Sequence, residues 1–341
     1  MNVVYLTNKL VNGGGEQVLL HLLRGVREAG GQASILFLGT RNAIVPEIRG
    51  EMEAAGACVV MPNEVGKAWC MLQAATTVHL YNVNVYVKFL PIFPLISGRQ
   101  VICHVHGSAE SANPWARRLF RARWNPCKEI VFVSEAGRSS WGIARGEVVT
   151  NPVILPLRRD GAFGETGNRL RLLSVNRLVS VKRVAAQIDI LAALREREGF
   201  DATLDIVGEG PEREALEAKA ETVGLGTALR FLGQVAHNDV LQLYQNYDAF
   251  LATSSAEGLG IGLIEALAAG LPAFAAPIPP FREVAAVGGG VSFVDPDNPA
   301  TAAQTIAAVM STSTPSIAEI AELRDTFDAD AFVTRILGMY L

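Results

Sequence analysis

Short apolar runs rich in β-branched residues alternate with helix-length amphipathic stretches along almost the whole chain, and this alternation restricts the possible folds most. It is typical of βαβ units, in which parallel strands form a sheet and helices cover its faces. The strand-length runs form two sets. The first contains Val3–Leu6, Ser34–Leu38, Cys58–Met61, Thr77–Leu80, Gln100–Val105 and Glu129–Val133; the second contains Arg171–Val175, Ala202–Val207, Leu229–Leu232, Ala249–Ala252, Ala273–Ala275 and Val291–Phe293. We predict an α/β chain with two Rossmann-like, doubly wound parallel sheets.

A polar segment with prolines, glycines and charges, Thr150–Asn168, separates the two sets and is predicted to be an interdomain linker. The predicted domains are residues 1–155 and residues 168–327. The last stretch, residues 328–341, is expected to form a helix that packs back onto the first domain. Two such sheets joined once would face a central cleft at their carboxyl edges, where doubly wound folds bind ligands.

The composition excludes several classes of protein. The chain has 341 residues, half of them apolar and 19% charged, so intrinsic disorder is excluded. No run of 18 uninterrupted apolar residues occurs, and the first residues do not resemble a signal or transit peptide. A net charge of −4 argues against nucleic acid as the main partner. These features predict a cytoplasmic globular protein.

The sequence favours no metal centre. Its four cysteines match no zinc spacing and are predicted to be buried, reduced thiols: Cys58, Cys70, Cys103 and Cys127. His104 and His106 should point to the same side of a strand end and could bind zinc as a pair, but a third ligand with suitable spacing is missing. The Asp-x-Asp sequences at Asp295–Asp297 and Asp328–Asp330 lie near the C-terminus, away from any mid-chain strand.

Three consecutive glycines, Gly13, Gly14 and Gly15, follow the first predicted strand and precede a helix predicted over Gln17–Glu28. Glycines let the backbone approach a ligand closely, and the free amides of a helix N-terminus favour an anion such as phosphate. The loop lacks the GxGxxG and GK[ST] fingerprints. A ligand-binding loop and a plain tight turn are both consistent with these residues.

Two cations, Arg177 and Lys182, follow the first strand of the second set. Lys182 is expected at a helix start, where a cation opposes the helix dipole unless an anion offsets it. The two side chains could hold a diphosphate, the arginine as a fork and the lysine as a point charge. The alternative is a pair of solvated surface cations.

The segment Ser254–Pro272 carries the most information. It follows a predicted strand, turns through three alternating glycines and enters a helix that ends at Gly270. Glu265 is expected in the first turn of that helix, where its carboxylate could accept both hydroxyls of a ribose. Glu257, eight residues earlier, lies in the loop and could face a sugar. A helix-capping glutamate and a solvated loop acid are the alternatives.

These residues resemble a known family. Glu257 and Glu265 match the E-x7-E motif of retaining GT-B-fold glycosyltransferases, and EGLGIGLIEALAAGLP is similar to a pattern of glycosyltransferase family 4, also called glycosyl transferases group 1. Further segments match in the same order: Gly13–Glu16, His104–Ser108, Val133–Glu135, Asn176–Lys182 and Val207–Pro211. The resemblance is stronger in the second half. It implies the GT-B fold, with an acceptor-side first domain and a second domain that binds a nucleotide-sugar.

The resemblance also implies which residues act. The implied catalytic residues are His106, Arg177, Lys182 and Glu257, and the implied donor-binding residues are Gly13, Gly14, Gly15, Gly208, Gly233, Gly258, Leu259, Gly260, Ile261 and Glu265. In such enzymes the arginine and lysine hold the diphosphate, the first glutamate contacts the donor sugar and the second binds the ribose. The histidine meets the donor sugar from the first domain, and backbone near Gly208 and Gly233 contacts the base. No cofactor and no metal is implied.

The implied reaction is retaining transfer of a hexosyl unit from a nucleotide-sugar, with a UDP-sugar as the expected donor. The acceptor would be a glycan or a lipid-linked acceptor in polysaccharide, lipopolysaccharide or glycoconjugate synthesis. A GT-B-fold nucleotide-sugar epimerase and a non-catalytic nucleotide-sugar-binding subunit are the alternatives. The chain departs from the family pattern at Arg183, where glycine is usual, and at Pro277–Pro280, where a Gly-Gly turn is frequent. Both departures affect the shape of the donor pocket.

The segment Trp115–Trp124 places four arginines and three aromatic residues within ten positions. On an acidic protein such a cluster could contact an anionic membrane surface or a phosphate-bearing acceptor. Aromatic residues at helical spacing are also common in a helix that packs against the core. The sequence therefore predicts a cytoplasmic enzyme and names one candidate segment for peripheral contact with the inner face of the membrane.

Overall fold

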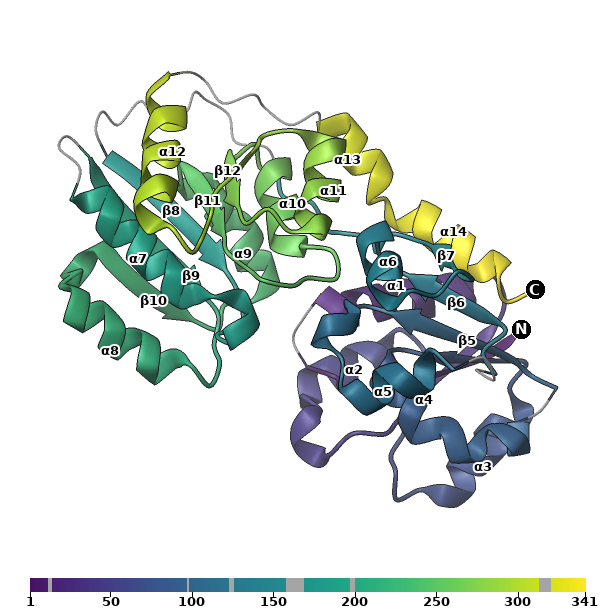
Figure 1. Ribbon diagram of the computed structural model, residues 1–341. Coiled ribbons are helices and arrows are strands. Elements are labelled where there is room, and N and C mark those ends of the chain that lie inside the picture. The colour runs from purple at the N-terminus through teal and green to yellow at the C-terminus, as the bar shows by residue number, and fades with distance from the viewer. Residues whose placement is uncertain (12–13, 97, 123–125, 158–168, 197–199, 313–319) are drawn as a thin grey trace. The chain divides into compact units, whose positions relative to one another are not determined.

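The computed structural model describes residues 1–11, 14–96, 98–122, 126–157, 169–196, 200–312 and 320–341. The chain divides into two compact units (Figure 1). Unit 1 consists of Met1–Pro152 together with Phe327–Leu341, and unit 2 consists of Val153–Thr326. The boundary between the units falls inside the segment with linker composition, of which residues 158–168 lie outside the described part.

Unit 1 contains a seven-stranded parallel sheet in the order β3-β2-β1-β4-β5-β6-β7. Its strands are β1 (Asn2–Thr7), β2 (Gln32–Phe37), β3 (Cys58–Val60), β4 (Thr77–Leu80), β5 (Gln100–Val105), β6 (Glu129–Phe132) and β7 (Glu147–Val148). The six strands predicted for this half are all present. The seventh, β7, escapes prediction because two residues are too few to show an apolar pattern.

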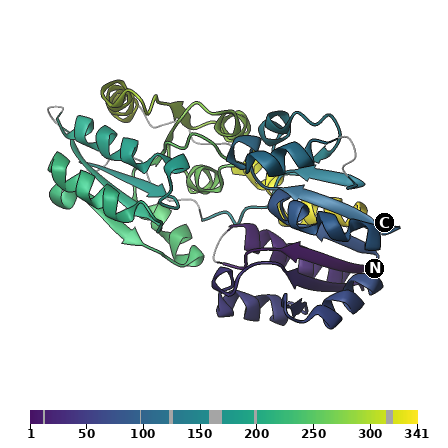
Figure 2. The ribbon, with the colours of Figure 1, turned by 60° about the horizontal axis from the view of Figure 1, so that its bottom comes forward.

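Helices cover both faces of this sheet (Figure 2). They are α1 (Gly14–Glu28), α2 (Pro46–Ala54), α3 (Val65–Ala74), α4 (Val83–Phe89), α5 (Pro114–Phe120), α6 (Glu135–Trp141) and α14 (Ala329–Gly338), with 3-10 turns η1 (Arg41–Ala43), η2 (Leu90–Ile96) and η3 (Ala109–Ser111). The helix predicted from Gln17 begins at Gly14 instead. Gly14 and Gly15 are therefore helical, with Glu16 in the first turn, where an acid favours the helix dipole.

Unit 2 contains a six-stranded parallel sheet in the order β10-β9-β8-β11-β12-β13. Its strands are β8 (Arg169–Val175), β9 (Asp201–Val207), β10 (Leu229–Gly233), β11 (Ala249–Ala252), β12 (Ala273–Ala275) and β13 (Val291–Phe293). Its helices are α7 (Val184–Arg195), α8 (Arg213–Val223), α9 (His237–Leu243), α10 (Ile261–Ala268), α11 (Pro279–Gly288), α12 (Pro299–Thr312) and α13 (Ile320–Thr326), with 3-10 turns η4 (Ser180–Lys182), η5 (Gly226–Ala228) and η6 (Tyr244–Asn246). All six predicted strands are present.

Burial explains why the strands could be predicted from the sequence. The central strand β1 pairs with β2 on one side and β4 on the other, and its residues Val3–Leu6 are fully buried. A parallel strand covered on both faces is apolar at most positions, so it appears as a near-continuous apolar run. The same holds for Leu172 of β8 and Leu204 of β9, which belong to the core of unit 2. The predicted fold class, two Rossmann-like parallel-sheet domains, is confirmed.

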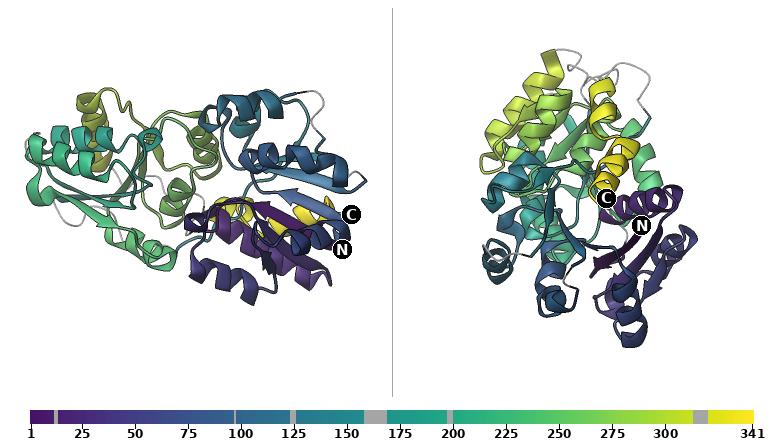
Figure 3. Two further views of the ribbon diagram at one scale, coloured as in Figure 1. Left: turned by 90° about the horizontal axis from the view of Figure 1, so that it is seen from below. Right: turned by 90° about the vertical axis from the view of Figure 1, so that its right-hand side faces the viewer.

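The last helix, α14, packs against α1 within unit 1 (Figure 3). The approach is close because Gly25 of α1 leaves room for Val333: a Cβ at position 25 would lie 2.2 Å from Cγ1 of the valine. Just beyond α14, the hydroxyl of Tyr340 lies 3.1 Å from the hydroxyl of Tyr5 and 2.6 Å from Nδ1 of His79. The end of the chain is thus tied to β1 and β4.

The prediction of four buried thiols is wrong for two of them. All four cysteines are free, and Cys103 and Cys127 are buried, but Cys58 and Cys70 are exposed. Cys58 begins β3, the edge strand of its sheet, and Cys70 lies on α3, whose one buried residue is Leu72. Apolar sequence neighbours therefore did not indicate burial at these two positions, because an element at the edge of the unit is covered by the rest of the protein on one side only.

Candidate functional site

The strand order of unit 2 reverses between β8 and β11. From β8 the chain continues to β9 and β10 on one side of the sheet, and from β11 it continues to β12 and β13 on the other. In doubly wound sheets, ligands bind outside the carboxyl ends of the strands at such a reversal. The loop after β8 carries Arg177 and Lys182, and the loop after β11 carries Glu257. The predicted cations and the first predicted glutamate therefore flank the reversal.

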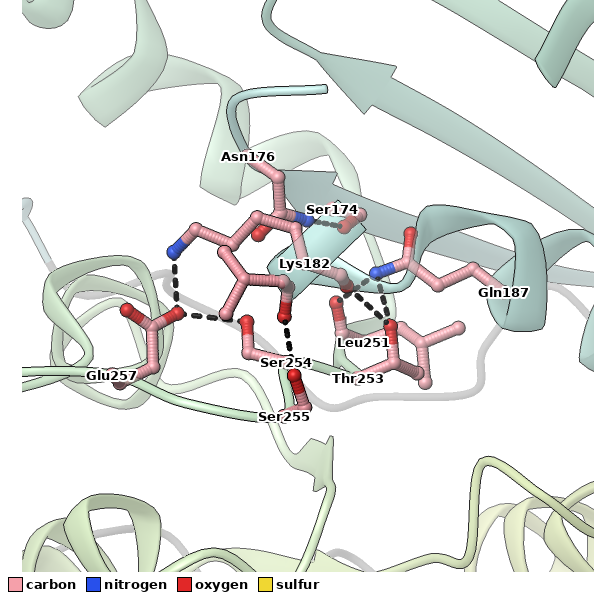
Figure 4. A network of polar contacts seen from close by, with 10 residues as sticks. Ser174, Asn176, Lys182, Gln187, Leu251, Thr253, Ser254, Ser255 and Glu257 are labelled. Carbon is pink, nitrogen blue, oxygen red and sulfur yellow. Dashed lines mark hydrogen bonds and ion pairs between the residues drawn. The ribbon is translucent and has the colours of Figure 1, made fainter. Parts of the chain in front are cut away.

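Lys182 and Glu257 meet in an ion pair between these two loops (Figure 4). Nζ of Lys182 donates to Oε1 of Glu257, and the hydroxyl of Ser254 donates to the same oxygen at 2.7 Å. The lysine and glutamate side chains are 18% and 15% exposed. The carboxylate is thus the anion that offsets the lysine charge just ahead of α7. The pair is shielded from bulk solvent but still accessible.

Buried hydrogen bonds hold the backbone around Lys182. The hydroxyl of Thr253 donates to the carbonyl oxygens of Lys182 and Arg183, each at 3.1 Å, and accepts from Nε2 of Gln187 at 3.0 Å. The backbone N–H of Ser255 donates to a carbonyl oxygen of η4 at 2.8 Å. Thr253 and Gln187 are fully buried. Figure 4 shows the bonds of Thr253 to Lys182 and Gln187, which join the two loops. The position of the lysine is therefore set before any ligand arrives.

Arg183, which connects η4 to α7, has a φ of +51°, and it is the one non-glycine residue with positive φ in the described part of the chain. For a residue with a Cβ this left-handed conformation costs about 1 kcal/mol or more. Its guanidinium forms an ion pair with Asp297. The departure from the family pattern therefore places backbone strain directly beside Lys182.

Arg177 is exposed, and its guanidinium has no hydrogen-bond or ion-pair partner among the described residues. The neighbouring backbone lies against the loop after β9. At Gly208, whose φ is +128°, a Cβ would lie 1.8 Å from the carbonyl oxygen of Asn176. The N–H of Gly208 donates to the carbonyl oxygen of Gly233 at 2.8 Å. Gly208 and Gly233, the two glycines predicted near the nucleotide base, are thus adjacent to each other and to the loop that carries Arg177. Packing against Asn176 is enough to require glycine at position 208.

Glu265 lies in the second turn of α10, so its prediction in the first turn is wrong. Gly258, Leu259 and Gly260 form the turn into this helix, which begins at Ile261, and Gly260, with a φ of +91°, is its N-cap. Because α10 begins at once after Gly260, Glu265 is the fifth helical residue. A Cβ at Gly260 would lie 2.8 Å from the ring of Phe281, so glycine is required there by both space and backbone angle.

Two side chains that the sequence did not indicate hold the carboxylate of Glu265. Oε1 accepts a hydrogen bond from Nε2 of His237, and Oε2 accepts one from the hydroxyl of Tyr244, each at 2.8 Å. The bond to Glu265 raises the pKa of His237 above its ordinary value, against the effect of burial. Burial and the nearby carboxylate raise the pKa of Tyr244 well above its ordinary value, so it remains a donor. The one sequence signal for His237 and Tyr244 is that they follow the predicted strand that became β10.

The predicted residues of unit 1 gather at the carboxyl ends of β1, β4 and β5. Tyr81 follows β4, and its hydroxyl donates to the carbonyl oxygen of Gly15 at 2.6 Å. The ring of Tyr81 lies 4.4 Å from the ring of His106, which follows β5. Gly14 begins α1 beside them, whereas Gly13 lies outside the described residues. Tyr81, which sequence reasoning missed, thus connects the glycine segment to the histidine.

His106 belongs to a stack of imidazoles. Its ring lies 4.1 Å from that of His104, as expected for two residues on one side of a strand end, and His79 lies 5.5 Å from His104. Nδ2 of Asn151 lies 3.2 Å from Nδ1 of His106. An amide nitrogen only donates, so Nδ1 accepts and the ring proton is on Nε2. Burial lowers the pKa of His106 to about 3, which keeps it neutral at pH 7.

Within the described residues, no group of three or more histidine, cysteine, aspartate or glutamate side chains is arranged to hold a metal ion. The histidine stack, which contains a third imidazole, does not form such a group. The aspartates of the two Asp-x-Asp sequences do not form one either.

The basic aromatic segment is described up to residue 122, so Arg123 and Trp124 lie outside the described part. Its helix α5 divides the aromatic residues: Phe120 is buried in the core of unit 1, whereas Trp115 is 71% exposed. A concavity of about 400 Å³ on this surface is lined by Pro114, Arg117, Arg118, Arg121 and Ala122. None of the helices that the structure describes is long and apolar enough to traverse a bilayer.

Of these arginines, Arg121 is held by the backbone, because its guanidinium donates to the carbonyl oxygens of Trp141 at 2.6 Å and Ser140 at 2.7 Å. Arg117 and Arg118 have no acidic partner among the described residues. Their positive charges therefore remain available to an external anion.

Comparison with known proteins agrees with this geometry. Residues 160–328 match the family model described as Glycosyl transferases group 1. No curated protein sequence matches the chain. The matched region contains Arg177, Lys182, Glu257 and Glu265, and it lies almost wholly within unit 2.

Solved structures match over nearly the full length. HepE of Anabaena, in complex with UDP and glucose, is 19% identical with a TM-score of 0.81, covering 99% of this chain and 98% of that chain. A mutant of S. aureus TarM, in complex with fondaparinux, alpha-GlcNAc-glycerol and UDP, is 11% identical with a TM-score of 0.75, covering 100% of each chain. A glycosyltransferase from Rickettsia africae is 16% identical with a TM-score of 0.72, covering 99% of this chain and 97% of that chain. These similarities establish the GT-B fold.

Proposed function

We propose that this chain, which carries a glycosyl transferases group 1 domain, is a retaining family 4 glycosyltransferase. It transfers a hexosyl unit from a UDP-sugar to a glycan or lipid-linked acceptor in polysaccharide, lipopolysaccharide or glycoconjugate synthesis. The observation that carries the proposal is the contact between Lys182 and Glu257 at the strand-order reversal of unit 2. The UDP bound to HepE and to the TarM mutant supports a uridine donor.

The diphosphate of the donor binds between Arg177 and Lys182. The exposed guanidinium contacts two phosphate oxygens as a fork, and the lysine acts as a point charge. Negative charge develops on the diphosphate as its bond to the sugar breaks, and the two cations stabilise that charge. Neither a metal ion nor a cofactor is part of the proposal.

Transfer proceeds with retention. The acceptor hydroxyl attacks the anomeric carbon from the face that the diphosphate leaves; its oxygen bonds to that carbon, the carbon–diphosphate bond breaks, and its proton passes to a diphosphate oxygen. Glu257 contacts the donor sugar, a role that the family resemblance also gives to His106. Analysis of the product anomer by NMR checks this scheme, and an inverted product would contradict it.

A panel of UDP-, GDP- and ADP-sugars, with and without EDTA, tests the function. We expect a thermal shift with the UDP-sugar, unaffected by EDTA, and slow release of UDP. Absence of a shift with every nucleotide-sugar would remove the proposal. Epimerised donor formed without an acceptor would identify an epimerase, and binding without turnover in acceptor-rich extract would identify a non-catalytic subunit.

We also propose that the protein is cytoplasmic and that α5 contacts an anionic membrane surface. Charge supports this: unit 1 has 16 basic and 12 acidic side chains, whereas unit 2 has 14 and 22. Arg117 and Arg118 have no acidic partner among the described residues, and the exposed Trp115 beside them suits a membrane interface.

Sedimentation with phosphatidylglycerol vesicles, but not with phosphatidylcholine vesicles, is the expected result. A double variant, Arg117→Gln with Arg118→Gln, should lose it. Replacing the exposed Arg24 and Arg27 of α1 by Gln removes the same charge from the same unit and should not. If both double variants lose vesicle binding equally, the binding depends on the net charge of unit 1 and not on α5, which would contradict the proposal.

A further inference from the structure

Glu265 presents a buried carboxylate whose two oxygens each have one side-chain partner among the described residues, His237 for Oε1 and Tyr244 for Oε2. Its side chain is 4% exposed. A carboxylate oxygen can accept about two hydrogen bonds, so each oxygen retains one acceptor position for a ligand. The histidine and tyrosine therefore fix the plane of the carboxylate while leaving it able to accept two hydroxyls.

The protonation state of His237 sets the net charge of the group formed by Glu265, His237 and Tyr244. His237 is 29% exposed, whereas Tyr244 is fully buried. Among the described residues, the ionisable group that contacts the ring is Glu265 of α10. Tyr244 of η6 reaches the ring through that carboxylate, and Asp239 lies on the same helix as the histidine. With a neutral imidazole the group carries one negative charge, and with an imidazolium it carries none. A diphosphate is repelled by the first form and not by the second.

We propose that His237 and Tyr244 are positioning residues that present Glu265 to the ribose diol of a nucleoside diphosphate-sugar, and that protonation of His237 strengthens binding of this ligand. The inference rests on the proposed function, because that function assigns the ribose to Glu265. An anion that prefers the imidazolium form binds best below the pKa of His237 and more weakly as the pH rises through it. Since the bond to Glu265 raises the pKa of His237, the loss of affinity lies toward neutral pH.

Calorimetric titration with UDP-glucose between pH 5.5 and 8.5 tests the inference, since its diphosphate diester does not titrate in this range. We expect the affinity of the wild type to fall about five- to tenfold across the interval. His237→Gln can still donate to Oε1 but cannot be protonated, so its affinity should be nearly independent of pH. Tyr244→Phe should bind severalfold more weakly at every pH, with the slope of the wild type.

Two control variants separate these effects from general destabilisation. His21→Gln removes a histidine of unit 1, and Tyr247→Phe removes a hydroxyl that donates to Asp205 at 2.6 Å elsewhere in unit 2. Both should bind as the wild type does. If wild type and His237→Gln show the same slope, the inference fails while the function stands. If the wild type binds no UDP-glucose at any pH, both fail together.

Discussion

Nζ of Lys182 forms an ion pair with Oε1 of Glu257, 75 positions away in the chain. In the proposed function, Lys182 binds a phosphate and Glu257 contacts a sugar, which are the two groups that a nucleotide-sugar joins. Because the carboxylate already offsets the lysine charge, the unliganded protein tolerates this cation beside α7. Within unit 2, the pair is the part of the proposed machinery that the geometry defines best.

Lys182→Ala should lower turnover about a hundredfold or more, because it removes one of the charges that stabilise the departing diphosphate. The free energy of unfolding should fall by about 3 kcal/mol or less, because the substitution leaves the largely buried Glu257 without its cation while Ser254 still donates to it. Steady-state kinetics and thermal unfolding measure both. Lys219→Ala, which breaks the pair with Asp189 in the same unit, is the matched control and should leave turnover unchanged. An unaltered rate in Lys182→Ala would contradict the proposed binding of the diphosphate by Arg177 and Lys182.

Arg183→Gly should be more stable than Arg183→Ala by about 1 kcal/mol. Both variants lose the ion pair with Asp297, so their difference isolates the strain of a Cβ at a φ of +51°. Urea unfolding followed by circular dichroism gives the two free energies. Equal stability would mean that this backbone is not strained.

Gly208→Ala should disrupt the loop that carries Arg177, because its Cβ would lie 1.8 Å from a backbone oxygen that cannot move aside freely. We expect a loss of about 2 kcal/mol or more in the free energy of unfolding. Gly224→Ala is the control: its φ is +76°, but nothing lies within 4 Å of the added Cβ. The free energy of unfolding of Gly224→Ala should fall only by the cost of placing a Cβ at this positive φ. A similar loss in both variants would show that the close approach is not tight.

Unit 1 should lose stability as the pH falls below about 6.5. Burial lowers the pKa of His79 and of His106 to about 3, and that of His104 well below its ordinary value. Between about 6.5 and 3 the unfolded chain therefore binds protons that the folded unit excludes, at about 1.4 kcal/mol per proton and pH unit. Glu16, whose pKa burial raises to about 7, acts in the opposite direction with a single proton.

All four tryptophans belong to unit 1, so urea unfolding followed by tryptophan fluorescence reports on this unit alone. The unfolding midpoint should be lower at pH 5 than at pH 7. His79→Gln should reduce the difference, because it removes one of the buried imidazoles. A midpoint that does not move between the two pH values would contradict the neutral histidine stack.

The strands and the motif-bearing loops were predictable from local patterns. A central parallel strand such as β1 is buried on both faces and shows a continuous apolar run from Val3 to Leu6. Gly260, at the N-cap of α10, has a backbone angle that favours glycine. Errors occurred where the local pattern is weak. The strand β7 is too short to show a pattern. Cys58 lies on an edge strand, although its apolar sequence neighbours suggested burial. The predicted start of α10 was too late, so Glu265 was placed one turn too early in the helix.

The sequence by itself determined the two parallel sheets and the loops, after β8 and β11, that carry Lys182 and Glu257, because burial and turn chemistry act over a few residues. Only the tertiary structure decided which side chains meet. His237 reaches Glu265 from 28 positions away, and Tyr81 joins Gly15 to His106 across three strands. Such contacts depend on which strands become neighbours in the sheet, and that order arises from the packing of the whole unit.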